Sequence, residues 1–340
     1  MQVIIGGYTA EMDGGAAGLR SLVVGRDEHG AVHLDEAGDL ALTSPSYLIA
    51  HPDRPWLFAV TEGTRSLVHS LALAADGRLE QLTSRESGGE VGCHLALSPD
   101  GRYLVVAHYG SGSVSSFAVD NGGRLSERLD LMTFDGSGPV AERQDRSRAH
   151  QVVFAGGEIL VPDLGTDRVH RLALDPDGRF RTGAEPIVLP AGSGPRHLVL
   201  IEDFLVVACE LSAELWLGQR GDDGGWTEVQ RVPASTVDAD YPIAPSALRA
   251  DGNQVFVANR GAGTIAVFDL DLGSGRLIPL TEFPGGGSTP RDLVVHPDGL
   301  WVANQTDDLI SVFSRRALPP VRPRFEFASP SPACIVLGPR

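Results

Sequence analysis

"GCHLALSPDGRYLVVAHYGSGSVSSFAV" (residues 92–119) contains three short apolar strands separated by two turns. The turn "SPDGR" joins the first two strands, and the Gly- and Ser-rich turn "GSGS" precedes the third. Strands of about five residues joined by such turns are typical of an antiparallel β-meander. The stretch therefore predicts one unit of an all-β protein.

The same plan recurs along the whole chain. The plan is repeated in residues 45–73, 149–174, 195–218, 245–270 and 290–315. A weaker fourth strand follows in places, as in "RLIPLTEF" at 276–283. The first positions of the inner strands lie 42 to 57 residues apart, close to the period of about 40–50 residues of a propeller blade. We therefore predict an all-β fold, a seven-bladed β-propeller with four-stranded antiparallel blades. These first positions are Ser46, Cys93, His150, Arg196, Ser246, Arg291 and Ala333.

The seventh repeat is divided between the two ends of the chain. "QVIIGGYT" (2–9) and "GLRSLVV" (18–24) match a second and a third strand, whereas "SPACIVL" (331–337) matches only a first strand. The N- and C-terminal strands should therefore share one blade, which closes the ring and removes exposed sheet edges. Because the Gly-rich stretches recur as turns within the period, we expect residues 1–340 to form a single β-propeller domain.

Composition excludes several classes of function. The net charge is −16, with 44 acidic residues against 28 basic ones, none of them lysine. This balance argues against a nucleic-acid partner and excludes Schiff-base chemistry by lysine. With no apolar run of about 18 residues and no leader, we expect a cytoplasmic protein with no membrane partner. Cys93, Cys209 and Cys334 lack the spacing of a disulfide framework or a zinc site, and no metal or cofactor is expected. The sequence leaves the oligomeric state open.

Charged residues converge at one end of the predicted channel. In a propeller the first strand of each blade lines the channel and the second runs antiparallel to it, so the start of one and the end of the other meet at the same mouth. A hairpin turn near 202–203 should bring Arg196 into contact with Glu210. A cationic cluster in so acidic a chain indicates a small anionic ligand. The residues placed at the mouth are His150, Arg196, Arg291, Glu62, Glu210 and Arg260.

Structural roles are the alternative for these residues. Arg196 and Glu210 can form an ion pair that only braces two strands, and a lone histidine such as His150 is often structural. We expect Glu62 and His108 to line the pocket rather than to act in catalysis.

Several motifs together carry a resemblance to a known family: "GSGPVAERQDRSRAHQV" (136–152), "PDLGTDRV" (162–169), "GSGPRHL" (192–198), "CELS" (209–212), "NRG" (259–261) and "TPRDL" (289–293). The sequence resembles the lactonase family of seven-bladed β-propellers, which includes bacterial propeller-type 6-phosphogluconolactonases and the fungal enzyme that interconverts 3-carboxymuconate and its muconolactone. One departure is Ser147–Arg148, where the family often has a proline and a second histidine, and it is expected to alter the rim or the substrate preference.

The resemblance implies a function and a site. It implies metal-independent opening of a small anionic lactone, with 6-phosphogluconolactone as the first substrate to expect. Glu210 or His150 would be the general base, and the arginines would stabilise the oxyanion and hold the anionic group. A cycloisomerase acting on a carboxymuconate-type lactone and a non-catalytic binding scaffold stay open as alternatives. The expected catalytic residues are His150, Glu210, Arg196 and Arg260, which the mouth geometry also selects, and the expected substrate-binding residues are Arg291, Arg143 and Asn259.

Overall fold

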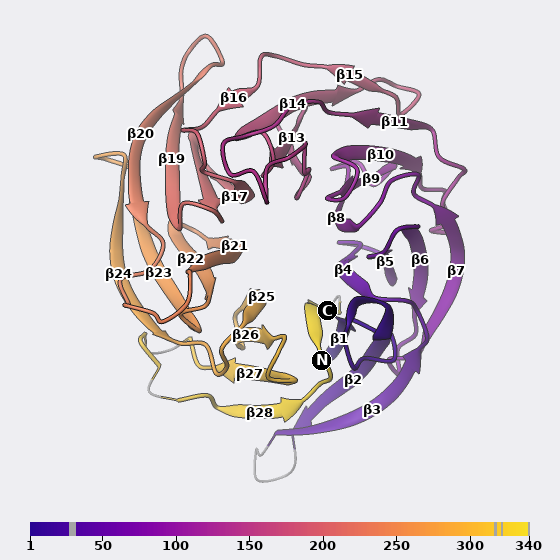
Figure 1. Cartoon of the computed structure of the whole chain (residues 1–340). Helices are drawn as coiled ribbons and strands as arrows, with labels where there is room; N and C mark the ends of the chain where they lie inside the picture. Colours follow the sequence, from indigo (N-terminus) through magenta and orange to yellow (C-terminus); the bar gives the residue numbers. More distant parts are fainter. Residues whose placement is uncertain (27–31, 316–317, 321, 339–340) are drawn as a thin grey trace.

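The computed structural model describes residues 1–26, 32–315, 318–320 and 322–338. Its strands form seven antiparallel sheets arranged in a ring around a central axis (Figure 1). Six sheets have four strands, and the seventh has a short additional strand, β16, on its third strand. The predicted seven-bladed β-propeller is therefore confirmed.

From the inner to the outer strand, the first three blades in chain order are β4 (Pro45–Ala50), β5 (Trp56–Thr61), β6 (Leu67–Leu73) and β7 (Leu79–Glu86); β8 (Gly92–Leu97), β9 (Tyr103–His108), β10 (Ser113–Ala118) and β11 (Asp130–Thr133); and β12 (Val153–Ala155), β13 (Glu158–Asp163), β14 (Arg168–Leu174) and β15 (Phe180–Thr182), with β16 (Ile187–Val188). The next three are β17 (Pro195–Ile201), β18 (Phe204–Cys209), β19 (Glu214–Arg220) and β20 (Trp226–Pro233); β21 (Ala244–Asp251), β22 (Gln254–Arg260), β23 (Thr264–Asp271) and β24 (Arg276–Pro284); and β25 (Pro290–His296), β26 (Gly299–Asn304), β27 (Leu309–Phe313) and β28 (Phe325–Ala328).

The two ends of the chain build the remaining blade together. It consists of β29 (Pro332–Leu337), β1 (Gln2–Gly7), β2 (Leu19–Arg26) and β3 (Val32–Leu40), in that order from the axis outward. Ile5 pairs with Ile335 across the junction, and the termini lie close together in Figure 1. The predicted closure of the ring is confirmed. A single 3₁₀ turn, η1 (Ala10–Met12), follows β1, and no helix among the described residues is long and apolar enough to cross a membrane.

The middle strands of the blades are buried on both faces. In β18, Val206 packs with Val255 of the following blade, whereas the next residue, Val207, packs with Leu160 of the preceding blade. Successive residues of a strand point to opposite faces, so each second strand reads as an almost continuous apolar run. The three cysteines are buried and free.

The inner strands share an irregularity that matters for function. In six of them a β-bulge falls at the first position. In β17, for example, Pro195 pairs with Cys209 and His197 with Ala208, which leaves Arg196 unpaired between them. A bulge inserts an extra residue and re-aims its side chain. The first positions are therefore free to point away from the ladder.

One detail of the chain differs from expectation. The inner strand of the third blade begins at Val153, three residues after His150. The preceding residues bond elsewhere: the Gln151 side chain accepts a hydrogen bond from Leu198 N–H at 2.6 Å, although His150 N–H still donates to Pro162 O.

Candidate active site

A buried carboxylate at the channel mouth is surrounded by arginines. Glu210 directly follows β18 and is 6% exposed. Its Oε1 accepts a hydrogen bond from Arg143 Nη2 at 2.6 Å. Its Oε2 lies 2.7 Å from Arg260 Nη2 and 3.0 Å from Arg196 Nε. We call these four residues the Glu210 cluster; three separate segments of the chain meet in it, and the predicted contact between Arg196 and Glu210 is present.

Electrostatics keep the Glu210 cluster cationic. Burial alone would raise the pKa of Glu210, but the guanidiniums of Arg260 and Arg196 outweigh burial and hold that pKa well below its ordinary value. Burial lowers the pKa of Arg196 to about 9, with the nearby Arg260 acting in the same direction. At neutral pH the cluster thus holds one carboxylate and three guanidiniums, which is an environment for an additional anion.

His150 lies beside this cluster and is neutral. Burial, reinforced by the charge of Arg196, holds its pKa well below the ordinary value of a histidine. Its ring packs edge-on against Tyr109 and His197, with ring centroids 5.5 and 5.6 Å away. An uncharged imidazole can accept or donate a proton within one catalytic cycle.

A second group, which we call the Glu62 cluster, consists of Glu62, Tyr8 and Arg291. The Tyr8 hydroxyl donates a hydrogen bond to Glu62 Oε2 at 2.7 Å and accepts one from Arg291. The Arg291 guanidinium also stacks over the Tyr8 ring, 4.8 Å from its centroid. Burial raises the pKa of Tyr8, and Arg291 opposes that shift only in part, so Tyr8 remains a hydrogen-bond donor at neutral pH.

Local backbone geometry positions the Glu210 cluster. Gly194 has a φ of +61°, and a Cβ there would lie 2.4 Å from Leu211 Cγ, so this turn requires glycine. The Gly194 carbonyl accepts a hydrogen bond from Glu210 N–H at 2.8 Å. The Gly194 N–H donates a hydrogen bond to Asp167 Oδ1, which also accepts one from the Gln144 side chain. Asp167 therefore ties the loop that carries Arg143 to the turn before Arg196.

First positions of the inner strands surround one cavity on the axis. Its lining includes Glu62 as well as six of the seven first positions: Ser46, Cys93, His150, Arg196, Arg291 and Ala333. Within the described residues, no three His, Cys, Asp or Glu side chains are grouped so that they could hold a metal ion.

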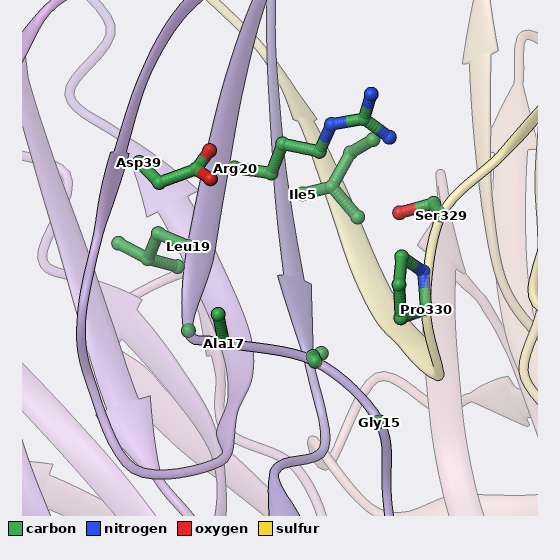
Figure 2. A pocket seen from close by; sticks show the side chains of 11 residues that line it. Ile5, Gly15, Ala17, Leu19, Arg20, Asp39, Ser329 and Pro330 are labelled. Carbon is green, nitrogen blue, oxygen red and sulfur yellow. The ribbon is translucent and has the colours of Figure 1, made fainter.

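A larger depression, lined by residues of β1, β2, β3 and the segment before β29, offers less chemistry (Figure 2). Its one guanidinium, Arg20, already pairs with Glu36 and donates to Ala328 O. The depression shares no residue with the cavity on the axis. We therefore place the candidate site at the channel mouth.

Comparison with known proteins identifies the family. Residues 2–337 match the family model described as "Lactonase, 7-bladed beta-propeller". The chain belongs to this lactonase family. Among curated family relatives, the 6-phosphogluconolactonase of Formosa agariphila is 27% identical over 295 residues, covering 81% of this chain and 82% of the relative. The 6-phosphogluconolactonase of Bacillus subtilis is 28% identical over 313 residues, covering 89% and 87%. A solved structure, the periplasmic gluconolactonase of Pseudomonas aeruginosa, is 26% identical with a TM-score of 0.88, covering 99% and 98%.

Not every expected site residue of this lactonase-family chain joins the Glu210 cluster. Arg291 belongs to the Glu62 cluster. The expected residues that lie together are His150, Glu210, Arg196, Arg260 and Arg143. The side chain of Asn259 is fully buried and donates to Ala234 O, which braces the fold. His108 is likewise fully buried, with its Nδ1 3.2 Å from Ser113 Oγ.

The departure from the family pattern lies at the rim. Arg148 stacks over the Tyr109 ring at 4.9 Å and pairs with Asp145 at 2.6 Å. Its position next to Tyr109 puts an additional guanidinium one ring away from His150.

Tyr8, Gln144 and Asp167 were missed by reasoning from the sequence. Tyr8 follows β1, the second strand of the blade shared by the termini, so the rule that selected Glu62 and Glu210 would have selected it too. The signal for Gln144 and Asp167 lies in the family motifs at 136–152 and 162–169, although it gives no role.

Proposed function

We propose that this protein hydrolyses a small anionic lactone at the channel mouth without a metal ion, with 6-phosphogluconolactone as the first candidate substrate. The Glu210 cluster, next to a neutral His150, is the observation that carries the proposal. The names of the relatives from Formosa agariphila and Bacillus subtilis support this substrate, and the gluconolactonase of Pseudomonas aeruginosa supports the reaction class.

Exposure distinguishes the roles of the three arginines. The side chains of Arg143 and Arg260 are 43% and 20% exposed, so a phosphate or carboxylate arriving from solvent can reach them. A guanidinium offers paired donors that match either anion. The Arg196 side chain is 4% exposed, and its charge would stabilise the oxyanion that develops on the lactone carbonyl.

The role of Glu210 is to hold the arginines. Both of its oxygens contact guanidiniums, and its lowered pKa makes it a poor proton acceptor. This differs from the expectation that Glu210 is one of two candidate bases. His150 remains available to exchange a proton with the leaving ring oxygen.

The test is acid release at constant pH from freshly generated 6-phosphogluconolactone, gluconolactone and 3-carboxymuconolactone. We expect the highest kcat/KM with the phosphorylated lactone. Arg143→Gln should lower kcat/KM for that lactone about tenfold, the loss of roughly 1.4 kcal/mol of binding, and leave neutral gluconolactone nearly unaffected.

Other outcomes separate the alternatives. Activity only toward 3-carboxymuconolactone would favour the cycloisomerase reading, and inactivity toward all three would refute lactone hydrolysis in favour of a scaffold. An equal loss on the charged and the neutral lactone would contradict the role of Arg143. The cytoplasmic location stays a prediction, since one solved relative is described as periplasmic.

A further inference from the structure

The cavity on the axis lies between the two charged clusters. Glu62 and Arg291 line it together with His150 and Arg196. Its volume is about 10 Å³, which suits about one water molecule. A sugar lactone exceeds this volume, whereas one water molecule fits it.

Two groups that line this cavity, Arg196 and Glu62, each have a polar atom without a hydrogen-bond partner among the described residues. Arg196 is 3% exposed, and its Nη1 has no hydrogen-bond partner among the described residues. The Tyr8 hydroxyl bonds Glu62 Oε2, and the described part of the chain provides no hydrogen bond to Glu62 Oε1. Buried polar groups are normally satisfied by protein or by ordered water. One water could accept a hydrogen bond from Arg196 and donate one to Glu62.

The two carboxylates at the mouth differ in the number of contacts that their oxygens make. Glu210 contacts three guanidiniums through its two oxygens. Glu62 accepts one hydrogen bond, from a neutral phenol, and the guanidinium of Arg291 lies 3.9 Å from the same oxygen. Oε1 of Glu62 therefore has no hydrogen bond from the described residues, whereas both oxygens of Glu210 contact guanidiniums.

We propose that Glu62 is the general base for lactone opening and acts on a water held in this cavity. The inference rests on the proposed lactone hydrolysis. Glu62 takes a proton from the water, and the water oxygen forms a bond to the lactone carbonyl carbon while Arg196 stabilises the negative charge on the carbonyl oxygen. The bond from that carbon to the ring oxygen then breaks. The ring oxygen takes up a proton delivered from Glu62 directly or through His150, which leaves a hydroxy acid.

Tyr8 is a positioning residue in this scheme. Its hydroxyl is held by Arg291 and fixes one oxygen of Glu62, so that the other oxygen stays available to the water. Tyr8→Phe removes this hydrogen bond but keeps the ring under Arg291. We expect a kcat about three- to tenfold lower, with KM unchanged, since a net hydrogen bond contributes roughly 1 kcal/mol.

The decisive experiment compares full-length Glu62→Ala and Glu210→Ala in the presence and absence of sodium formate, using whichever lactone the wild-type protein hydrolyses. Loss of a general base lowers the rate about 10²- to 10⁴-fold, and we expect this loss in kcat for Glu62→Ala. Formate is a small carboxylate base that can enter the space left by the missing side chain, so it should restore part of the activity of Glu62→Ala and none of that of Glu210→Ala. Glu36→Gln serves as control, because that carboxylate pairs with Arg20 at the surface.

Each outcome has a definite meaning. The assignment of Glu62 as the base is supported if Glu62→Ala is inactive, is rescued by formate and is shown to be folded by its thermal melting curve. Three results would overturn the assignment of Glu62 as the base and leave lactone hydrolysis in place. They are a near wild-type kcat for Glu62→Ala, a folded Glu62→Ala that formate does not rescue, and rescue of Glu210→Ala by formate. A wild-type protein inactive toward every lactone refutes the proposed function itself, and the base assignment with it.

Discussion

Replacing Glu210 by glutamine should destabilise the fold as well as impair binding. Gln keeps the size of the side chain but removes the carboxylate that Arg143, Arg196 and Arg260 all contact. Arg196 would suffer most, because its side chain is 4% exposed and cannot turn to solvent. Removing one partner of a buried ion pair leaves an uncompensated buried charge.

The size of the effect follows from burial and chain length. Breaking a buried pair costs about 3–5 kcal/mol, and we take about 3 kcal/mol because Arg143 and Arg260 are partly solvated. At an unfolding entropy of about 2.1 cal/mol/K per residue, this chain gives about 0.7 kcal/mol/K, so the melting temperature should fall by about 4 °C.

The loss of stability caused by Glu210→Gln should depend on pH. Folding lowers the pKa of Glu210, so its stabilisation is fully present above the pKa of an unfolded glutamate, about 4.3, and is lost as the pH falls toward the lower folded value. The melting difference between wild type and Glu210→Gln should thus be complete at pH 7 and smaller at pH 3.

Thermal melting at pH 7, 4 and 3 tests this prediction, with Glu36→Gln as the exposed control expected to change stability by less than about 1 kcal/mol. The double variant Arg196→Met/Glu210→Gln should recover part of the loss, since it removes the uncompensated charge. A Glu210→Gln protein that melts within about 1 °C of wild type at pH 7 would refute the reasoning, as would a deficit that persists unchanged in acid.

Two further predictions concern the fold. Deleting residues 332–340 removes β29, whose Ala333, Cys334 and Ile335 are buried, and should lower the melting temperature by more than about 10 °C or make the protein insoluble; unchanged melting would contradict closure of the ring. Burial holds the pKa values of His94, His150 and His197 well below the ordinary value of a histidine. Below about pH 6.5 the unfolded chain therefore binds more protons than the folded chain. Each of these histidines should then lower the free energy of unfolding by up to about 1.4 kcal/mol per pH unit. Urea unfolding at pH 7.5, 6 and 5 measures this loss, and pH-independent stability over that range would show that the three rings are not buried as neutral groups.

The repeat made most of the fold predictable. The spacing of the strands located the blades, and the mismatch between the terminal segments predicted the pairing of β1 with β29. The same logic placed Arg196 beside Glu210, because a short hairpin constrains both ends of its two strands. Tyr8 was predictable by this rule as well, but only after the terminal blade had been recognised as equivalent to the others.

Other features depend on partners that are distant in sequence. The bulge at Arg196 is defined by the hydrogen-bond register between β17 and β18. The sequence "GPRH" by itself does not predict that register. Just before the shortened β12, the Gln151 side chain accepts a hydrogen bond from Leu198 N–H, 47 residues away in the sequence. Asp167 acquires its role because two loops of separate blades converge on it.

Closure of the ring and the chemistry proposed for Glu62 are linked. Glu62, Tyr8 and Arg291 come from three successive blades, with the blade shared by the chain termini in the middle. The Glu210 cluster takes Glu210, Arg196 and Arg260 from two blades that are continuous in sequence. Opening the junction between β1 and β29 would therefore disrupt the Glu62 cluster first. Because the cavity lies between the two clusters, its geometry depends on the first and the last strand of the chain meeting at the axis.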